Sequence, residues 1–117
     1  MTSPRGPYSP VVAVGDWLVT AGQLGQVDGV LVDGGVVEQT RQALANVRAL
    51  LESEGASMAD VVKTTVFLVD IEDWAPMNEP YLEAFGDARP ARTAVAVAAL
   101  PLGGRVEVEA WAFRGER

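Results

Sequence analysis

Two consecutive β-type segments near the C-terminus constrain the fold of this chain more than any other feature. Residues Thr93 to Leu100 are almost all Ala and Val, and such a continuous apolar run predicts a strand that is buried on both faces. Residues Arg105 to Phe113 alternate Val or Ala with Glu or an aromatic residue, and this period of two predicts a strand with two unlike faces. The chain must therefore build a sheet in which at least one strand is central.

Two amphipathic patterns predict helices earlier in the chain. Apolar residues recur every three or four positions over 36–54, where Gln39 and Asn46 are expected on the polar surface. A second pattern covers 70–85, and Asp73 can cap this helix at its N-terminus. Its expected core stripe comprises Trp74, Met77, Tyr81 and Phe85.

Short apolar or β-branched segments predict the remaining strands, over 11–14, 17–20, 30–32 and 61–69. The order of elements indicates an α+β fold with both helices on one face of the sheet. The other face also carries apolar residues from several strands, and an exposed patch of that size is unusual for a monomer. We therefore expect an oligomer that packs sheet to sheet.

The composition excludes several classes of protein. The 117 residues suit a single domain, 1–117, and they contain no run of transmembrane length and no signal-peptide pattern, so we expect a cytoplasmic protein without membrane contacts. The absence of Cys and His excludes thiolate catalysis and removes the commonest metal ligands, and no metal site is predicted. A formal charge of −7 without a basic cluster argues against a nucleic-acid partner.

Several residues occupy positions where a binding site could form. Arg92 stands directly before an apolar strand, and its guanidinium either binds a carboxylate or phosphate or is an ordinary strand-flanking charge. Gly22 either allows the close approach of a ligand or simply ends a strand. Tyr8 either covers the edge of the core or has a function, and Asn78 either faces solvent or turns away from the helix axis beside Pro80.

An ordered set of short motifs extends over nearly the whole chain. It comprises Gly6-Pro7-Tyr8-Ser9, Ala21-Gly22-Gln23, Glu38-Gln39-Thr40, Asn46, the run from Asp60 to Phe67, Asn78 with Tyr81, Pro90-Ala91-Arg92, Leu100-Pro101 and Glu107-Val108-Glu109-Ala110. In their order and spacing these motifs resemble the YjgF/RidA family. No single motif is decisive, but the ordered set is specific.

The resemblance implies a chorismate-mutase-like α+β fold with a mixed sheet, in which the last strand lies between earlier strands. It implies a homotrimer whose sheets face inward and whose active sites lie between subunits. Members with the arginine of the Pro-Ala-Arg motif are enamine/imine deaminases, which hydrolyse reactive 2-imino acids from pyridoxal-phosphate enzymes to 2-oxo acids and ammonia. The resemblance implies that this reaction needs no cofactor.

The resemblance also assigns roles to individual residues. Arg92 would bind the substrate carboxylate, Glu107 would orient or activate the water, and Tyr8 would close the pocket. Ala21 stands where many members have Ser, and Ala94 stands where many have Cys, so the substrate preference stays open. The implied catalytic residues are Arg92, Glu107 and Tyr8, and the implied substrate-binding residues are Arg92, Gly22, Ala21, Asn78 and Ala94.

Two other functions compete with the deaminase. One is a non-catalytic trimer that binds small carboxylates as a regulator or scavenger. The other is a ribonuclease, against which the acidic charge and the absence of His argue, because phosphodiester cleavage needs cationic stabilisation and acid–base partners.

The spacing of Arg92 and Glu107 predicts a site shared between protomers. The tight connection between their strands makes the two strands antiparallel, with Arg92 at the far end of one and Glu107 near the turn end of the other. The expected offset is about six residues, or roughly 20 Å along the strands. A small imino acid is much shorter, so we expect the two residues of each site to come from different protomers.

Overall fold

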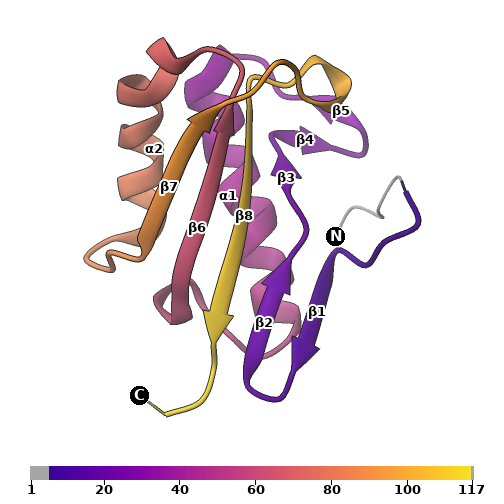
Figure 1. The fold of residues 1–117 in the computed structure, drawn as a ribbon, viewed down its shortest axis with the longest axis vertical. Helices are drawn as coiled ribbons and strands as arrows, with labels where there is room; N and C mark the ends of the chain where they lie inside the picture. The colour runs from indigo at the N-terminus through magenta and orange to yellow at the C-terminus, as the bar shows by residue number, and fades with distance from the viewer. Residues whose placement is uncertain (1–5, 117) are drawn as a thin grey trace.

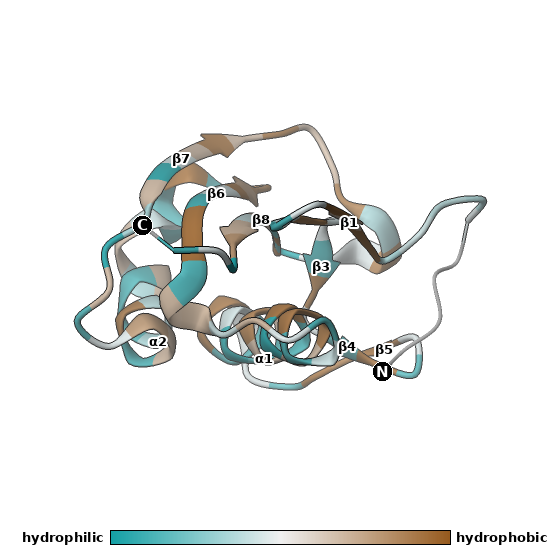
Figure 2. Ribbon diagram, turned by 90° about the horizontal axis from the view of Figure 1, so that it is seen from below, coloured by the Kyte–Doolittle hydropathy of each residue, from teal (hydrophilic) through white to brown (hydrophobic). Residues whose placement is uncertain are grey.

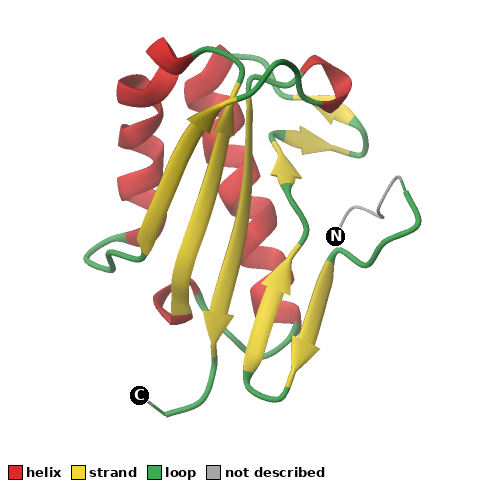
Figure 3. Ribbon diagram, in the orientation of Figure 1, coloured by secondary structure: helices red, strands yellow, loops and turns green. Residues whose placement is uncertain are grey.

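The last strand of the chain lies in the middle of the sheet, between strands that precede it in sequence (Figure 1). The computed structural model describes residues 6–116. The strands are β1 (Val11–Val14), β2 (Trp17–Thr20), β3 (Gln23–Leu24), β4 (Gln26–Val27), β5 (Val30–Leu31), β6 (Val61–Leu68), β7 (Ala91–Ala96) and β8 (Val106–Phe113), and the helices are α1 (Gly35–Ser53) and α2 (Trp74–Phe85). The main sheet has the order β1-β2-β8-β6-β7, with β3 also paired to β8, while β4 and β5 form a separate pair. This is the expected α+β fold with a mixed sheet and two helices (Figure 3).

Strand β6 pairs in parallel with β7 and antiparallel with β8, and α2 lies in the long connection that a parallel pair requires. Strand β7 includes Arg92 and ends at Ala96 rather than at the predicted Leu100, because its partner β6 ends at Leu68. The prediction that this run is buried on both faces was wrong for the single chain. Strand β7 has only one neighbour, and Val95 is 40% exposed on the uncovered face.

Both helices pack on the same face of the sheet, as Figure 2 shows from below. Helix α1 buries its apolar stripe, but its two expected surface amides do not both face water. Gln39 is buried and its Oε1 accepts the backbone N–H of Arg105 at 2.9 Å. Asn46 is half-buried, and its Nδ2 donates to the carbonyls of Leu24 and Gln26 at 3.0 Å. These two amides therefore fasten the start of β8 and the β3–β4 segment to α1.

Helix α2 runs without interruption through Pro80. Met77, Tyr81 and Phe85 are buried, as the sequence predicts, whereas Trp74 is 46% exposed at the start of the helix. The predicted core stripe is therefore one residue shorter than expected. Among residues 6–116, no helix combines the length and the apolar character needed to cross a bilayer.

The face of the sheet opposite the helices is uncovered in the single chain (Figure 2). Alternation along the paired strands directs several large apolar side chains to this face. The Trp17 and Trp111 rings meet edge to face, with their centroids 6.4 Å apart. The most exposed members of this open apolar face are Val12 (48%), Val14 (67%), Trp17 (40%), Val95 (40%) and Trp111 (45%).

Candidate active site

Arg92 projects from β7 toward α2, where side chains of the helix orient its guanidinium. Its Nη1 donates to Oδ1 of Asn78 at 2.8 Å and lies 3.8 Å from Sδ of Met77. The guanidinium carbon lies 4.7 Å from the centroid of the Tyr81 ring and 5.4 Å from that of Trp74. Among residues 6–116, no carboxylate forms a salt bridge with Arg92. The guanidinium is thus held in place while its charge stays available to an anion.

The Tyr81 ring that contacts Arg92 is itself held in place by a hydrogen bond to the sheet. Its hydroxyl shares a buried hydrogen bond of 2.8 Å with Oγ1 of Thr64 on β6. Burial raises the pKa of Tyr81, although the Thr64 hydrogen bond and the charge of Arg92 act in the opposite direction. The ring therefore stays neutral at ordinary pH and offers its face to the cation.

A cavity of about 300 Å³ opens beside Arg92. This volume is at the lower end of the range for small-molecule sites in proteins. No acidic residue of the described part of the chain lines the cavity, so none of these wall residues competes with an anionic ligand for Arg92. The lining residues are Asn78, Tyr81, Leu82, Arg89, Pro90 and Arg92.

A second group of candidate residues, Ala21, Gly22 and Glu107, lies at the connection between β2 and β3. Oγ1 of Thr20 accepts the backbone N–H of Ala110 at 3.0 Å, and Ala21 and Gly22 then leave the regular strand. Gly22 lies directly against the Glu107 side chain, because a Cβ at this position would lie only 2.7 Å from the Glu107 carboxyl carbon. The glycine therefore leaves room for the present position of the Glu107 carboxylate, and a larger residue would displace this side chain.

Glu107 is half-buried on the open face of β8. Burial raises the pKa of Glu107, and the negative charge of Glu109 on the same face raises it further. Among residues 6–116, no hydrogen bond or ion pair engages the Glu107 carboxylate. A carboxyl group with these properties is suited to taking up a proton and releasing it again.

Tyr8 lies in the segment that enters β1. Residues 1–5 lie outside the described part of the chain, and 6–10 contain neither helix nor strand. The Tyr8 side chain is exposed, and the backbone N–H of Ala21 donates to the carbonyl of Pro10 at 2.8 Å. This segment therefore leaves the sheet beside Ala21, on the side away from β7 (Figure 1). Ala94 is half-buried two residues beyond Arg92, on the same face of β7.

The two groups of candidate residues lie apart within one chain. Arg92 is level with Thr64 of β6, and Glu107 is level with Phe67, three residues further along the same strand. This offset amounts to about 10 Å along the strands, and the two intervening strand spacings add about 10 Å across them. Because the offset is an odd number of residues, the two side chains also point to opposite faces of the sheet.

The predicted offset of about six residues was therefore too large. The apolar run continues to Leu100, but β7 ends at Ala96 and the connection then crosses the end of β6. The structure brings Arg92 together with Asn78, and it brings Glu107 together with Gly22. The roles assigned to these residues stay predictions.

A contact that the sequence did not indicate joins the surroundings of the two groups. Nη2 of Arg105, at the entrance to β8, lies 2.8 Å and 3.1 Å from the two carboxylate oxygens of Asp73, which precedes α2. Asp73 was expected to cap α2, but its side chain makes no capping hydrogen bond. Arg105 therefore links the start of α2, next to Trp74, to the strand that carries Glu107. The only sequence signal was an arginine at the start of a strand.

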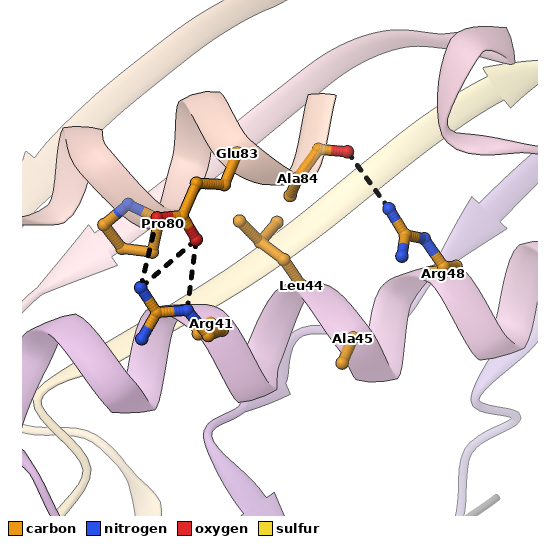
Figure 4. Close-up of a pocket in the computed structure, with 7 residues that line it drawn as sticks. All are labelled: Arg41, Leu44, Ala45, Arg48, Pro80, Glu83 and Ala84. Carbon is orange, nitrogen blue, oxygen red and sulfur yellow. Dashed lines mark hydrogen bonds and ion pairs between the residues drawn. The ribbon is translucent and has the colours of Figure 1, made fainter. Parts of the chain in front are cut away.

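A further cavity, of about 220 Å³, lies between the two helices on the outside of the molecule (Figure 4). Arg41 forms ion pairs there with Glu38 and with Glu83, the latter at 3.2 Å. Arg48 donates to the carbonyl of Ala84, also at 3.2 Å. Since Arg41 already has two carboxylate partners, this groove is less suited to an anion than the cavity beside Arg92. Among residues 6–116, no three acidic residues gather as a metal-binding group would.

The class of protein is defined by a mixed sheet with two helices on one face and by two polar groups. One is an arginine at the sheet edge that hydrogen-bonds to an amide and has no carboxylate partner among residues 6–116, and the other is a half-buried carboxylate on the open face. The family model described as Endoribonuclease L-PSP matches residues 1–114. The chain belongs to this family, which is the YjgF/RidA family that the motifs indicated.

Individual relatives are similar over most of their length. The chain is 48% identical to the 2-iminobutanoate/2-iminopropanoate deaminase of Capra hircus, over 94% of this chain and 82% of that protein. It matches the crystal structure of the E. coli YjgF gene product with a TM-score of 0.92 and 38% identity, over 97% and 93% of the two chains. E. coli TdcF with bound serine matches with a TM-score of 0.91 and 35% identity, over 97% and 93%.

Proposed function

We propose that this protein hydrolyses reactive 2-imino acids, or their enamine tautomers, to 2-oxo acids and ammonia without a cofactor. The main observation behind the proposal is the environment of the Arg92 guanidinium. Its guanidinium is oriented by Asn78, lies beside a cavity without acidic residues and has no carboxylate partner among residues 6–116. The identity of 48% to a 2-iminobutanoate/2-iminopropanoate deaminase supports the same substrate class.

In this proposal Arg92 binds the substrate carboxylate. A carboxylate and a guanidinium form two parallel hydrogen bonds in one plane, and this fixes the direction of the attached C=N group. Asn78 and Tyr81 already hold the guanidinium, so little conformational freedom is lost when the substrate binds. E. coli TdcF, a structural relative, has been crystallised with serine, which is a small molecule with the same carboxylate group.

Glu107 acts through water in the hydrolytic step. Its carboxylate accepts a proton as the water oxygen bonds to the imine carbon, and the same proton then passes to the imine nitrogen. The tetrahedral intermediate then carries a hydroxyl and an amino group. A second proton passes from this hydroxyl to the nitrogen as the C–N bond breaks and the new C=O bond forms, so the overall change adds one water and releases one ammonia. The raised pKa of Glu107 suits this exchange, because the group can both take up and return the proton. Tyr8 closes the site over the bound substrate.

The active site in this proposal lies between protomers of a homotrimer. A cyclic trimer joins two different surfaces of neighbouring copies, so the edge that carries Arg92 can meet the side that carries Glu107, Gly22 and Tyr8. The open apolar face supports such packing, because an oligomer with inward-facing sheets would bury Trp17 and Trp111.

A nuclease activity is named in the description of the family model, but the residues favour the imine reaction. The sequence has no His, and its formal charge is −7, which repels a polyanionic RNA. A carboxylate-binding protein without catalysis would need Arg92 but not the uncommitted Glu107. The role of Glu107 therefore distinguishes the deaminase from the non-catalytic carboxylate-binding protein.

The decisive experiment generates the imine in place, from an amino acid and an amino-acid oxidase, and follows its decay spectrophotometrically. The wild-type protein should accelerate the decay, and Arg92→Ala should abolish the acceleration. Arg48→Ala removes an exposed arginine from α1 and serves as the matched control. A wild-type protein that leaves the decay unchanged while still binding a 2-oxo acid would instead identify a carboxylate-binding protein.

A further inference from the structure

The cavity beside Arg92 contains a second guanidinium that the proposed reaction does not use. Arg89 lies in the connection between α2 and β7 and lines the same cavity as Arg92. Among residues 6–116, neither arginine forms a salt bridge with a carboxylate. Two cations without acidic partners around one cavity are unexpected in a chain whose formal charge is −7. This arrangement indicates a ligand with more than one negative charge.

The cavity between the two helices differs from the cavity beside Arg92 in the charges of its wall. That groove also has two arginines in its wall, but Glu83 lies in the same wall and pairs with Arg41 (Figure 4). Arg105 likewise has its own partner, Asp73. The cavity beside Arg92 therefore differs from the groove, because its wall, as far as the structure describes it, has two arginines and no acidic residue.

Both guanidiniums keep hydrogen-bond donors for a ligand. Arg92 uses its Nη1 for Asn78, and Arg89 uses its Nη1 for the carbonyls of Gly86 and Ala88, the latter at 2.9 Å. Each guanidinium has five N–H donors, so most of them stay unused in both residues. Pro90 stands next to Arg89 and restricts the backbone that sets the spacing of the two arginines.

We propose that the preferred substrates are 2-imino acids with a second acidic group, that is, 2-imino dicarboxylic acids of the kind formed from acidic amino acids. This inference rests on the proposed deaminase function. Arg92 binds the carboxylate next to the imine, and Arg89 binds the distal carboxylate. Tyr81, Leu82 and Pro90 supply the apolar wall against which the methylene groups of the substrate pack.

The test measures kcat/KM for imines generated from aspartate or glutamate and for imines generated from alanine or 2-aminobutanoate. In the wild type the dicarboxylic imines should be the better substrates. In Arg89→Gln the ratio of the two kcat/KM values should fall by about five- to tenfold, because a charged contact is lost at an exposed site. Added salt should reduce the wild-type ratio in the same direction.

The matched control is Arg48→Gln, which also removes an exposed arginine that donates to a carbonyl near the end of α2. This variant should keep the wild-type ratio, because Arg48 lines the other cavity. An unchanged ratio in Arg89→Gln, or equal losses with both kinds of imine, would overturn the role of Arg89. A wild-type preference for monocarboxylic imines would overturn the substrate class.

The failure of the deaminase itself gives a different result, since no imine would then be hydrolysed. Isothermal titration with 2-oxoglutarate and with 2-oxobutanoate separates the two cases. Tighter binding of 2-oxoglutarate that is lost in Arg89→Gln would support the dicarboxylate site even without turnover. Equal binding of the two 2-oxo acids would exclude it.

Discussion

Arg92 and Glu107 lie on opposite faces of one sheet. Their strands are separated by β6, and their positions differ by three residues along the strand direction. Arg92 is at the edge strand and turns toward α2, whereas Glu107 lies on the open face beside Gly22. One small substrate cannot contact both groups of the same chain. The sequence predicted only an offset along the strands, whereas in the structure the two side chains also point to opposite faces of the sheet. This second separation is further support for a site that is shared between protomers.

Replacement of Arg92 by lysine should not preserve activity. Lysine keeps the positive charge but lacks the planar pair of donors that matches a carboxylate, and it loses the Asn78 contact geometry and the stacking on Tyr81. We expect kcat/KM to fall by about 10²-fold in Arg92→Lys. The measurement is the imine-decay assay, with circular dichroism to show that the variant is folded. Arg48→Lys should behave as the wild type, and turnover near the wild-type value in Arg92→Lys would remove the carboxylate-binding role.

The register that separates the two residues could only partly be predicted from sequence. Alternation defined β8 and its two faces, because each inward position is Val or Ala. The end of β7 could not be predicted, since Val97 to Leu100 are as apolar as the strand itself. Strand β7 stops where β6 offers no further partner, and that limit is a contact between distant segments. Gln39 was misassigned for the same reason, because its partner, the Arg105 N–H, is 66 residues away.

Glu107→Gln should stabilise the folded protein at neutral pH. The folded protein holds the Glu107 proton more tightly than the unfolded chain, because burial and Glu109 raise its pKa. The stabilising contribution is therefore fully present below the ordinary glutamate pKa of about 4.3, and it is lost as pH rises through the raised value. Gln is neutral at every pH, so thermal unfolding at pH 7 should occur at a higher temperature in Glu107→Gln.

This difference in unfolding temperature should shrink toward zero below about pH 4, where Glu107 is protonated in both the folded and the unfolded state. Glu52→Gln, which removes an exposed carboxylate from α1, is the matched control for the loss of one negative charge. Equal unfolding temperatures of wild type and Glu107→Gln from pH 4 to pH 8 would contradict the raised pKa.

The same substitution should lower turnover while leaving ligand binding intact. If Glu107 accepts a proton from water, kcat should fall by about 10²-fold or more in Glu107→Gln. In the wild type, the acid limb of the kcat/KM profile should lie above the ordinary glutamate range. In Glu109→Gln this limb should shift to lower pH, because one of the two causes of the raised pKa is removed. A wild-type rate in Glu107→Gln would exclude proton transfer by Glu107 and leave it as a solvated surface charge.

The residues of the candidate site that belong to short motifs could be predicted from sequence. Residues that join the site only through contacts between distant segments could not. Arg92 and Asn78 were both selected from sequence, and the structure places them 2.8 Å apart. Trp74 was assigned to the core by its helical spacing, yet it lies exposed beside Arg92. Spacing along α2 places Trp74 on the inward stripe, but the sheet ends at β7, so the indole stays 46% exposed beside the Arg92 guanidinium. No sequence motif pointed to Arg89 as a site residue, because its relation to Arg92 is that both line one cavity of the folded protein.

Charge on the open apolar face should prevent oligomer formation. Trp111 is 45% exposed on that face and contacts Trp17. In the proposed trimer, Trp111→Lys would place a cation in an interface that excludes water, so sedimentation should show a shift from trimer to monomer. Val30→Lys is the control, because Val30 is 69% exposed on β5, outside the main sheet. A wild type that sediments as a monomer would overturn the trimer itself.

Mixed trimers should recover activity that neither parent has. Arg92→Ala and Glu107→Ala chains are each expected to be inactive, because each lacks one side of every shared site. When the two are unfolded together and reassembled in equal amounts, a site is intact only if one chain supplies Arg92 and its neighbour supplies Glu107. Random assembly makes about one quarter of the sites intact, so the mixture should reach about one quarter of the refolded wild-type activity. If both residues acted within one chain, no mixed trimer would contain an intact site. A mixture that stays inactive while the wild type recovers under the same protocol would therefore exclude the shared site.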